Sequence, residues 1–385
     1  MKFFHLSDLH IGKHLFYYSL LEDQKYVFHQ ILEAAKEEQP DAVLLCGDIY
    51  DKTIPSAEAV SLFDWFLTEL KETLPKALIL IIAGNHDSGE RLEFARELLE
   101  KEGVFIAGLP PREADEKIRK VTMTDPAGEV CFYLLPFTKP SHLRKKYEEE
   151  KIDSYEDAVK KLLEEEEIDT TKRNVLLSHQ FYLSGGSEPL TCDSEIRMAG
   201  GIDQIDTRLL EDFDYVALGH IHKPQWVQKG KIRYSGSILK YSFSESRQKK
   251  SVTILEFGEK GKLQVTEREL PVQTDLRTLR GPLEELLRCA EPSEDWIRVE
   301  LTDEKVVPYA IERLRTVYPN VLEMVYLKQE ERTPAVRTEA AAVPTKTLLE
   351  LLETFYQDVC QYPIAEDPEA AALLKDICEE VGMNP

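Results

Sequence analysis

The chain has 385 residues. A domain with a single hydrophobic core is usually smaller than this, so we expect at least two domains. Its 48 basic and 71 acidic residues give a formal net charge of −23, which argues against binding nucleic acid through a broad basic surface, although bound cations, local basic patches or a basic partner can offset it. The six cysteines form no C-x-x-C pair, no apolar run is long enough to cross a bilayer, and we expect no signal peptide, so we predict a cytoplasmic protein.

The first hundred residues are predicted to alternate strands and helices, and each strand ends in polar residues. The expected strands and the polar residues after them are 2–6 with Asp8 and His10, 42–45 with Asp48, and 78–83 with Asn85, His86 and Asp87. Helices are expected at 20–39, at 56–73 and at 90–102. This βαβ order predicts a mostly parallel sheet, which binds its ligands at the carboxyl ends of the strands.

The next part of the chain is predicted to repeat the same pattern twice. Strands at 175–177 and 215–218 lead into His179 and into the pair His220 and His222. Other expected elements are strands at 121–123 and 130–135, a helix at 148–169 and a long loop at 185–201. Three further strands, expected at 232–235, 252–257 and 263–270, alternate as antiparallel strands do and should close the second face of a sandwich.

Four segments are predicted by composition and pattern. They are a main domain at 1–272, a small α/β domain at 273–330 (strand 296–301, helix 307–318, strand 321–327), a linker at 331–346, and a helix pair at 347–385 (helices 347–361 and 368–381). The first of these two helices has an apolar stripe too wide for a lone surface helix. The pair either folds back on the body or binds a partner, and the linker before it favours a partner.

The residues after the five strands form one chemical set. Apart from His86 and Asp87, the set holds two aspartates, one asparagine and four histidines. Oxygen and imidazole ligands without thiolates suit Mn²⁺, Fe²⁺ or Zn²⁺. A carboxylate such as Asp48 can bridge two cations, and two metals roughly 3.5–4 Å apart form the usual clamp for phosphoester displacement.

These residues compose five motifs, D-x-H, G-D, G-N-H-D, a lone His after a strand, and G-H-x-H, in the order in which the calcineurin-like metallophosphoesterases carry them. The chain therefore resembles that family, and the resemblance implies a four-layer α/β/β/α sandwich with two divalent metal ions. It implies that one metal is held by Asp8, His10, Asp48 and His222, and the other by Asp48, Asn85, His179 and His220. By the same resemblance His86 is the catalytic residue that protonates the leaving oxygen or stabilises the transition state. Asp51 stands where archaeal relatives carry a second histidine, which implies a role in positioning His86 or the phosphate, and Asp87 is expected to order its turn.

Within that family the chain is similar to the SbcD nucleases. The similarity rests on F-x-H-x-S-D-x-H-x-G at 3–12, G-D-I-Y-D at 47–51, Y-S-G-S at 234–237, and the long extension beyond the sandwich. It implies a Mn²⁺-dependent 3′–5′ exonuclease on duplex DNA that also cuts single strands and hairpins, in repair, recombination and replication. It also implies a homodimer whose C-terminal helices bind an SbcC-like coiled-coil ATPase.

Two other functions remain open from the residues. Small cyclic-nucleotide phosphodiesterases share G-N-H-D and G-H-x-H, although they usually end near the sandwich, and a non-catalytic scaffold can occupy the same fold. The basic clusters at 144–146 and 247–250 are either phosphate contacts or solvated surface.

Overall fold

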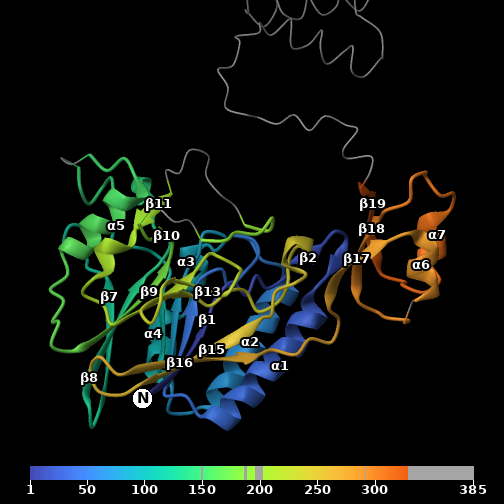
Figure 1. Ribbon diagram of the computed structural model, residues 1–385. Coiled ribbons are helices and arrows are strands. Elements are labelled where there is room, and N and C mark those ends of the chain that lie inside the picture. The colour runs from blue at the N-terminus through green and yellow to red at the C-terminus, as the bar shows by residue number, and fades with distance from the viewer. Residues whose placement is uncertain (149–150, 186–188, 196–202, 290, 328–385) are drawn as a thin grey trace, which may run out of the picture. The chain divides into compact units, whose positions relative to one another are not determined.

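A computed structural model describes residues 1–148, 151–185, 189–195, 203–289 and 291–327 (Figure 1). Residues 1–326 form one compact unit. The predicted linker and C-terminal helix pair, and much of the loop predicted at 185–201, lie outside the described residues. Among the helices of the described ranges, none combines the length and hydrophobicity that a membrane span requires.

Six strands form the first sheet. In order across the sheet they are β16 (Leu263–Glu269), β15 (Ser251–Phe257), β1 (Lys2–Leu6), β4 (Ala42–Cys46), β5 (Leu78–Ile82) and β6 (Val104–Ala107). The strands β1, β4, β5 and β6 are parallel, as expected from the βαβ order, and the helices α1 (Leu21–Glu38) and α2 (Ala57–Thr73) connect the first three. The side chains of β4 are all buried, which agrees with its continuous apolar run.

The placement of the last two long strands differs from the prediction. We expected them to close the second face of the sandwich, but β15 pairs antiparallel with β1, and β16 pairs with β15, both in the first sheet. Leu255 and Phe257 pack between the two sheets, while Val252 and Ile254 pack on the helix side. Since both faces of β15 are apolar, it is stable beside a central strand that is covered on both sides.

Six other strands form the second sheet. In order they are β13 (Gln225–Gln228), β14 (Ile232–Tyr234), β12 (Tyr215–Gly219), β9 (Arg173–His179), β8 (Gly128–Leu135) and β7 (Arg119–Asp125). The inner four are parallel, and β7 and β13 are antiparallel edge strands. The strand predicted at 232–235 is therefore in the second sheet, where it pairs parallel with β12 and antiparallel with β13.

The two sheets face each other across a shared apolar core, in which the Phe3 and Phe132 rings meet edge to face with centroids 5.2 Å apart. Helices α1 and α2 cover the outer face of the first sheet, and the Phe28 and Phe66 rings stack there with centroids 4.2 Å apart. Helix α5 (Tyr155–Glu164) covers the second sheet (Figure 1). These layers confirm the predicted α/β/β/α sandwich.

Two predicted helices of the sandwich differ in extent from the prediction. The segment predicted at 90–102 is divided into α3 (Gly89–Leu92), α4 (Arg96–Leu99) and the 3₁₀ turn η1 (Glu100–Glu102). Ala95 takes a left-handed φ of 59°, and the Glu93 carboxylate accepts a hydrogen bond from the Gly108 amide at 2.9 Å, so a tertiary contact overrides helix propensity. The helix predicted at 148–169 is α5 alone, because Ser154 caps it in a reciprocal capping box with Asp157.

A small three-stranded parallel sheet follows the sandwich. It contains β17 (Leu276–Gly281), β18 (Trp296–Leu301) and β19 (Val321–Tyr326), with helices α6 (Leu283–Arg288) and α7 (Ala310–Arg315), and has its own apolar core. The helix predicted at 307–318 is thus shorter, and β17 and α6 were not predicted. Short elements complete the described chain: β2 (His14–Leu15), β3 (Tyr18–Ser19), β10 (Phe181–Leu183), β11 (Gln204–Asp206), and the 3₁₀ turns η2 (Pro140–His142), η4 (Thr207–Leu210) and η5 (Phe243–Glu245).

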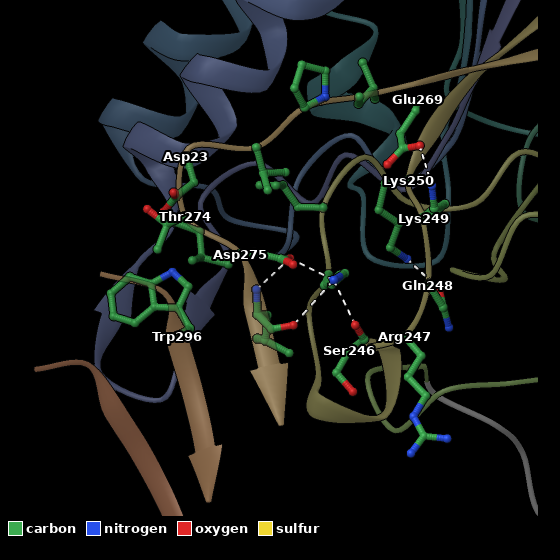
Figure 2. Close-up of a pocket in the computed structure, with 17 residues that line it drawn as sticks. Asp23, Ser246, Arg247, Gln248, Lys249, Lys250, Glu269, Thr274, Asp275 and Trp296 are labelled. Carbon is green, nitrogen blue, oxygen red and sulfur yellow. Dashed lines mark hydrogen bonds and ion pairs between the residues drawn. The ribbon is translucent and has the colours of Figure 1, made fainter. Parts of the chain in front are cut away.

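A cavity of about 340 Å³ lies where the small sheet meets the sandwich (Figure 2). Lys240 crosses this junction, and its ammonium group is 2.7 Å from the Asp275 carboxylate and 2.9 Å from the Ser246 carbonyl oxygen. Tyr18 and Trp296 pack across it with ring centroids 4.9 Å apart. The cavity contains none of the predicted site residues.

Candidate metal centre

The five polar turns come from the carboxyl ends of strands in both sheets, and hydrogen bonds join them. The Asp8 amide donates to the Gly47 carbonyl at 3.0 Å, and the His220 amide donates to the Asp8 carboxylate at 3.0 Å. The His86 amide donates to Asp48 Oδ1 at 2.9 Å. Each turn therefore fixes its neighbour, within a sheet and across the two sheets.

The backbone at the site has unusual geometry. Eight non-glycine residues in the described part of the chain have positive φ, and four of them are predicted ligands: Asp8 at 52°, His10 at 43°, Asp48 at 49° and His220 at 97°. Such conformations cost of order 1–3 kcal/mol each and persist where the surrounding structure enforces them. Gly47 and Gly84 leave the necessary room, because a Cβ on Gly84 would lie 2.1 Å from Asp48 Oδ1 and one on Gly47 2.3 Å from His179 Nδ1.

The first predicted ligand set is assembled and buried. His10 Nε2 is 3.1 Å from His222 Nε2 and 3.5 Å from Asp48 Oδ2, and His222 Nε2 is 3.9 Å from Asp8 Oδ1. At most 2% of each of these four residues is exposed. Three of them, Asp8, His10 and His222, present ligand atoms that lie within 4.8 Å of one another.

The second predicted set meets the first at Asp48. His179 Nε2 is 3.4 Å from Asp48 Oδ2 and 3.1 Å from Asn85 Oδ1. The same Asn85 oxygen is 2.9 Å from His220 Nδ1. All seven predicted ligands thus converge, with the Asp48 carboxylate between the two sets.

The electrostatics of the cluster suit cations. Burial lowers the pKa of His10 well below its usual range and that of His220 to about 3, so these rings are neutral, as metal ligation requires. Burial would raise the pKa of the Asp48 carboxyl, but the adjacent His179 ring lowers it well below its usual range. Burial opposes charge on His179 as well, yet Asp48 raises the pKa of that ring to about 9. Without a metal the His179 ring therefore keeps its proton, which a bound cation would displace. Buried carboxylates, an amide oxygen and imidazoles form a donor set that fits divalent metal ions.

One fully buried nitrogen of the cluster has no hydrogen bond. His10 Nδ1 is buried and unpaired, and it lies 3.7 Å from Asp51 Oδ1. The other ring nitrogen, Nε2, faces the carboxylate and imidazole groups of the cluster. Since an unpaired buried polar atom is costly, the ring is held here against its own hydrogen-bonding preference, as is common at functional sites.

His86 is half buried and borders the ligands. Its Nδ1 lies 2.9 Å from the Asp51 carbonyl oxygen, which can only accept, so Nδ1 carries a hydrogen and Nε2 is left for another partner. The ring lines a shallow groove of about 450 Å³, together with Lys52, Thr53, Ile54 and Asn85. It also comes within 4.8 Å of His10 and Asp48 ligand atoms, so it lies at the edge of the cluster.

Asp51 contacts the site in two ways. Its backbone carbonyl orients His86, while its carboxylate forms an ion pair with the Lys13 ammonium group at 2.7 Å. Asp87 orders its turn as expected, because its carboxylate accepts hydrogen bonds from the amides of Gly84 at 2.8 Å, Tyr50 at 2.9 Å and Ile49 at 3.1 Å.

Sequence reasoning missed residues that support the first turn. The Gln24 amide donates to the carbonyl oxygens of His10 at 2.7 Å and Leu9 at 3.1 Å, and Tyr241 donates to Leu9 as well. A signal for Gln24 was present, because a polar residue stands in the buried stripe of its helix with Val27 and Ile31. Tyr241 lies far away in the sequence and carries no motif.

The two basic clusters contribute structural lysines. The Lys146 side chain is 1% exposed and pairs with Glu165 at 2.9 Å, and the Lys250 side chain is 2% exposed and pairs with Glu245 at 2.6 Å. Lys249 pairs with Glu269, as Figure 2 shows. Lys146 and Lys250 are therefore buried structural residues, whereas Lys249 forms an ion pair on the surface.

Comparisons with known proteins agree with this fold. The model of the calcineurin-like phosphoesterase family matches residues 1–224, more than half of the chain, and that of the type 5 capsule protein repressor C-terminal domain matches residues 272–359. The sandwich and the family match together define the class of the protein. The chain is an enzyme of the metal-dependent phosphoesterase class.

Two relatives define the family more narrowly. The SbcD component of the SbcCD nuclease of Staphylococcus epidermidis is 30% identical over 374 residues, which cover 95% of each chain. The SbcD component of Staphylococcus saprophyticus is 31% identical over 335 residues, which cover 84% of each chain. A solved structure of a dimetal phosphatase from Danio rerio is similar with a TM-score of 0.40 and 11% identity, over 70% of this chain and 96% of that one. The chain belongs to the SbcD family of nucleases.

Proposed function

We propose that this chain is a Mn²⁺-dependent DNA nuclease that hydrolyses phosphodiester bonds with two metal ions. The observation that supports this most is the convergence of seven nitrogen- and oxygen-bearing side chains on two sites that share Asp48. Asp8, His10, Asp48 and His222 would hold one ion, and Asp48, Asn85, His179 and His220 the other. The ions would activate the attacking water and offset the charge that develops at phosphorus.

The residues of the chain would have separate roles in holding the ions, binding the phosphate and transferring the proton. The buried ligand turns fix the positions of the ions, since each turn is hydrogen-bonded to the next. The groove beside His86 would receive the scissile phosphate. A protonated His86 would give the leaving oxygen a proton from Nε2, while Nδ1 stays bonded to the Asp51 carbonyl. Asp51 would act by positioning His86, and Lys13 would hold the Asp51 side chain in place.

The proposed substrate and partners rest on the family to which the chain belongs. We propose 3′–5′ exonuclease action on duplex ends and cleavage of single strands and hairpins, in DNA repair, recombination and replication in the cytoplasm. The relatives are named as components of SbcCD. We therefore expect a homodimer that binds an SbcC-like coiled-coil ATPase through the helices predicted at 347–385, which follow the small domain predicted at 273–330 in the sequence.

The test is a nuclease assay on the purified chain. End-labelled linear duplex DNA is incubated with Mn²⁺, with Mg²⁺ or with EDTA, beside a cyclic mononucleotide and a cyclic dinucleotide. We expect Mn²⁺-dependent loss of the label, absent with EDTA and in Asp48→Ala. Hydrolysis of a cyclic nucleotide with the DNA intact would assign the site to a small-molecule phosphodiesterase. No hydrolysis of any substrate by a chain that binds Mn²⁺ would favour the scaffold.

A further inference from the structure

His222 is held on three sides by residues that no motif predicted. Its backbone amide donates to Glu195 Oε1 at 2.7 Å, and its carbonyl oxygen accepts from Lys250 Nζ at 2.8 Å. Its ring nitrogen Nδ1 lies 2.8 Å from Ser194 Oγ. Ser194 and Glu195 belong to the described segment 189–195, so a stretch remote in sequence fixes this ring.

The direction of these hydrogen bonds follows from the chemistry of the groups. Ser194 Oγ lies 2.6 Å from Glu245 Oε1, and a carboxylate can only accept, so the single hydroxyl hydrogen of Ser194 goes to Glu245. The Ser194 oxygen must then accept from Nδ1 of His222. That ring therefore carries its hydrogen on Nδ1 and keeps a lone pair on Nε2, the atom that faces His10 at 3.1 Å.

Glu245 is buried and held in position by several hydrogen bonds. It is 0% exposed, and its carboxylate also accepts from Lys250 Nζ at 2.6 Å, from Ser242 Oγ at 3.0 Å and from the Tyr241 amide at 3.2 Å. Lys250 also donates to the Gln248 side-chain oxygen at 2.8 Å, a hydrogen bond drawn in Figure 2. Lys250 bonds both Glu245 and the His222 carbonyl. The Glu245–Lys250 ion pair therefore holds both the ring and the backbone of His222 in place.

We propose that Ser194 and Glu245 are positioning residues that hold His222 in the Nδ1–H tautomer and so present Nε2 to a divalent cation. A hydrogen-bond partner behind a ligating histidine fixes its tautomer and orientation, and its loss typically weakens metal binding 10- to 100-fold. The inference rests on the proposed function, because it takes His222 to be a metal ligand. Ser194 and Glu245 reach the cation only through His222.

The test combines two measurements on the full chain. Long-range ¹H–¹⁵N spectra of the metal-free protein, labelled at histidine, report the His222 tautomer directly. Calorimetric titration with Mn²⁺ reports the affinity of each site. Ser194→Ala is expected to lose the Nδ1–H signature and to bind one of two Mn²⁺ ions about tenfold more weakly, with the melting temperature of the metal-free chain unchanged. Ser194→Thr keeps the hydroxyl and is expected to restore both.

Ser242→Ala is the matched control, because it removes a hydroxyl that bonds the same Glu245 oxygen without touching His222. It is expected to keep the wild-type spectrum and affinity. The proposal is overturned if Ser194→Ala retains both, or if Ser242→Ala loses Mn²⁺ affinity equally, since the effect would then come from the packing of Glu245. A wild-type chain with the Nδ1–H tautomer but without Mn²⁺ binding would overturn the proposed function and the role of His222 as a ligand, while leaving the hydrogen-bond geometry supported.

Discussion

At the scale of single residues, His86 and Asp48 perform different parts of the proposed reaction although they are hydrogen-bonded neighbours. Asp48 lies between both ligand sets, whereas His86 borders the groove with one ring nitrogen committed to the Asp51 carbonyl. The two residues can therefore be separated by experiment, because only one of them should be needed for metal binding.

The first prediction concerns His86→Gln. We expect phosphodiester hydrolysis to fall by about 10²–10⁴-fold, the usual contribution of general acid–base catalysis, with Mn²⁺ affinity within a factor of a few of wild type. Rates are compared on the same linear duplex, and Mn²⁺ binding is measured by calorimetry. His29→Gln, an exposed substitution in α1, is the control and should change neither quantity. A His86→Gln chain that has lost Mn²⁺ instead would make His86 a ligand.

At the scale of elements, the sandwich is closed at one end by an ion pair between strands. Arg173 begins β9 with its side chain 1% exposed, and its guanidinium bonds the Asp125 carboxylate at the end of β7. It also donates to the carbonyl oxygens of Gly128 at 2.7 Å and Gly258 at 2.8 Å. The Arg173 side chain thus links the second sheet to the first, because Gly258 directly follows β15.

The second prediction is that Asp125→Asn lowers the free energy of unfolding by about 2 kcal/mol at pH 7, the scale of a hydrogen bond to a charged group. The hydrogen bond from Arg173 lowers the pKa of Asp125 below its ordinary 3.8, so the carboxylate stabilises the fold above that pH and the contribution disappears as the pH falls further. Urea unfolding from pH 7 to pH 2 should therefore show the difference between wild type and variant shrinking in acid. A difference that grows in acid would contradict this account.

The first sheet and the ligand turns were predictable because they depend on local patterns. Continuous apolar runs before Asp8, Asp48 and Asn85 indicate buried parallel strands, and such strands bring their ends to one edge. The position of β15 was not predictable, because its pairing with β1 joins residues about 250 positions apart, such as Lys2 and Glu256. The break at Ala95 and the contact of Ser194 with His222 likewise depend on distant partners that have no local signature.

At the scale of the whole molecule, the extension beyond the sandwich should serve assembly rather than chemistry. Every predicted ligand lies within the first 222 residues, and the small sheet has its own core. The apolar stripe predicted at 347–361 includes Leu348, Leu352 and Phe355. A stripe of this width on a helix after a linker is typical of a segment that binds a partner.

The third prediction is that Leu352→Asp abolishes binding of the SbcC-like partner while the chain alone keeps its hydrolysis rate. A charge on the apolar stripe would have to be buried in the complex, which is costly. Gln357→Asp adds the same charge off the stripe and should leave binding intact. Co-purification with the partner measures assembly, and a small chromogenic phosphodiester measures chemistry. Equal loss of hydrolysis in Leu352→Asp would show that the helix instead packs on the catalytic body.

The central claim is that five turns from two sheets hold two metal ions on either side of Asp48. A crystal structure of the chain grown with Mn²⁺, with anomalous data collected at the manganese edge, tests it most directly. The account predicts two anomalous peaks roughly 3.5–4 Å apart, both in contact with the Asp48 carboxylate, and their loss in Asp48→Ala. A single peak, or peaks away from these turns, would contradict it.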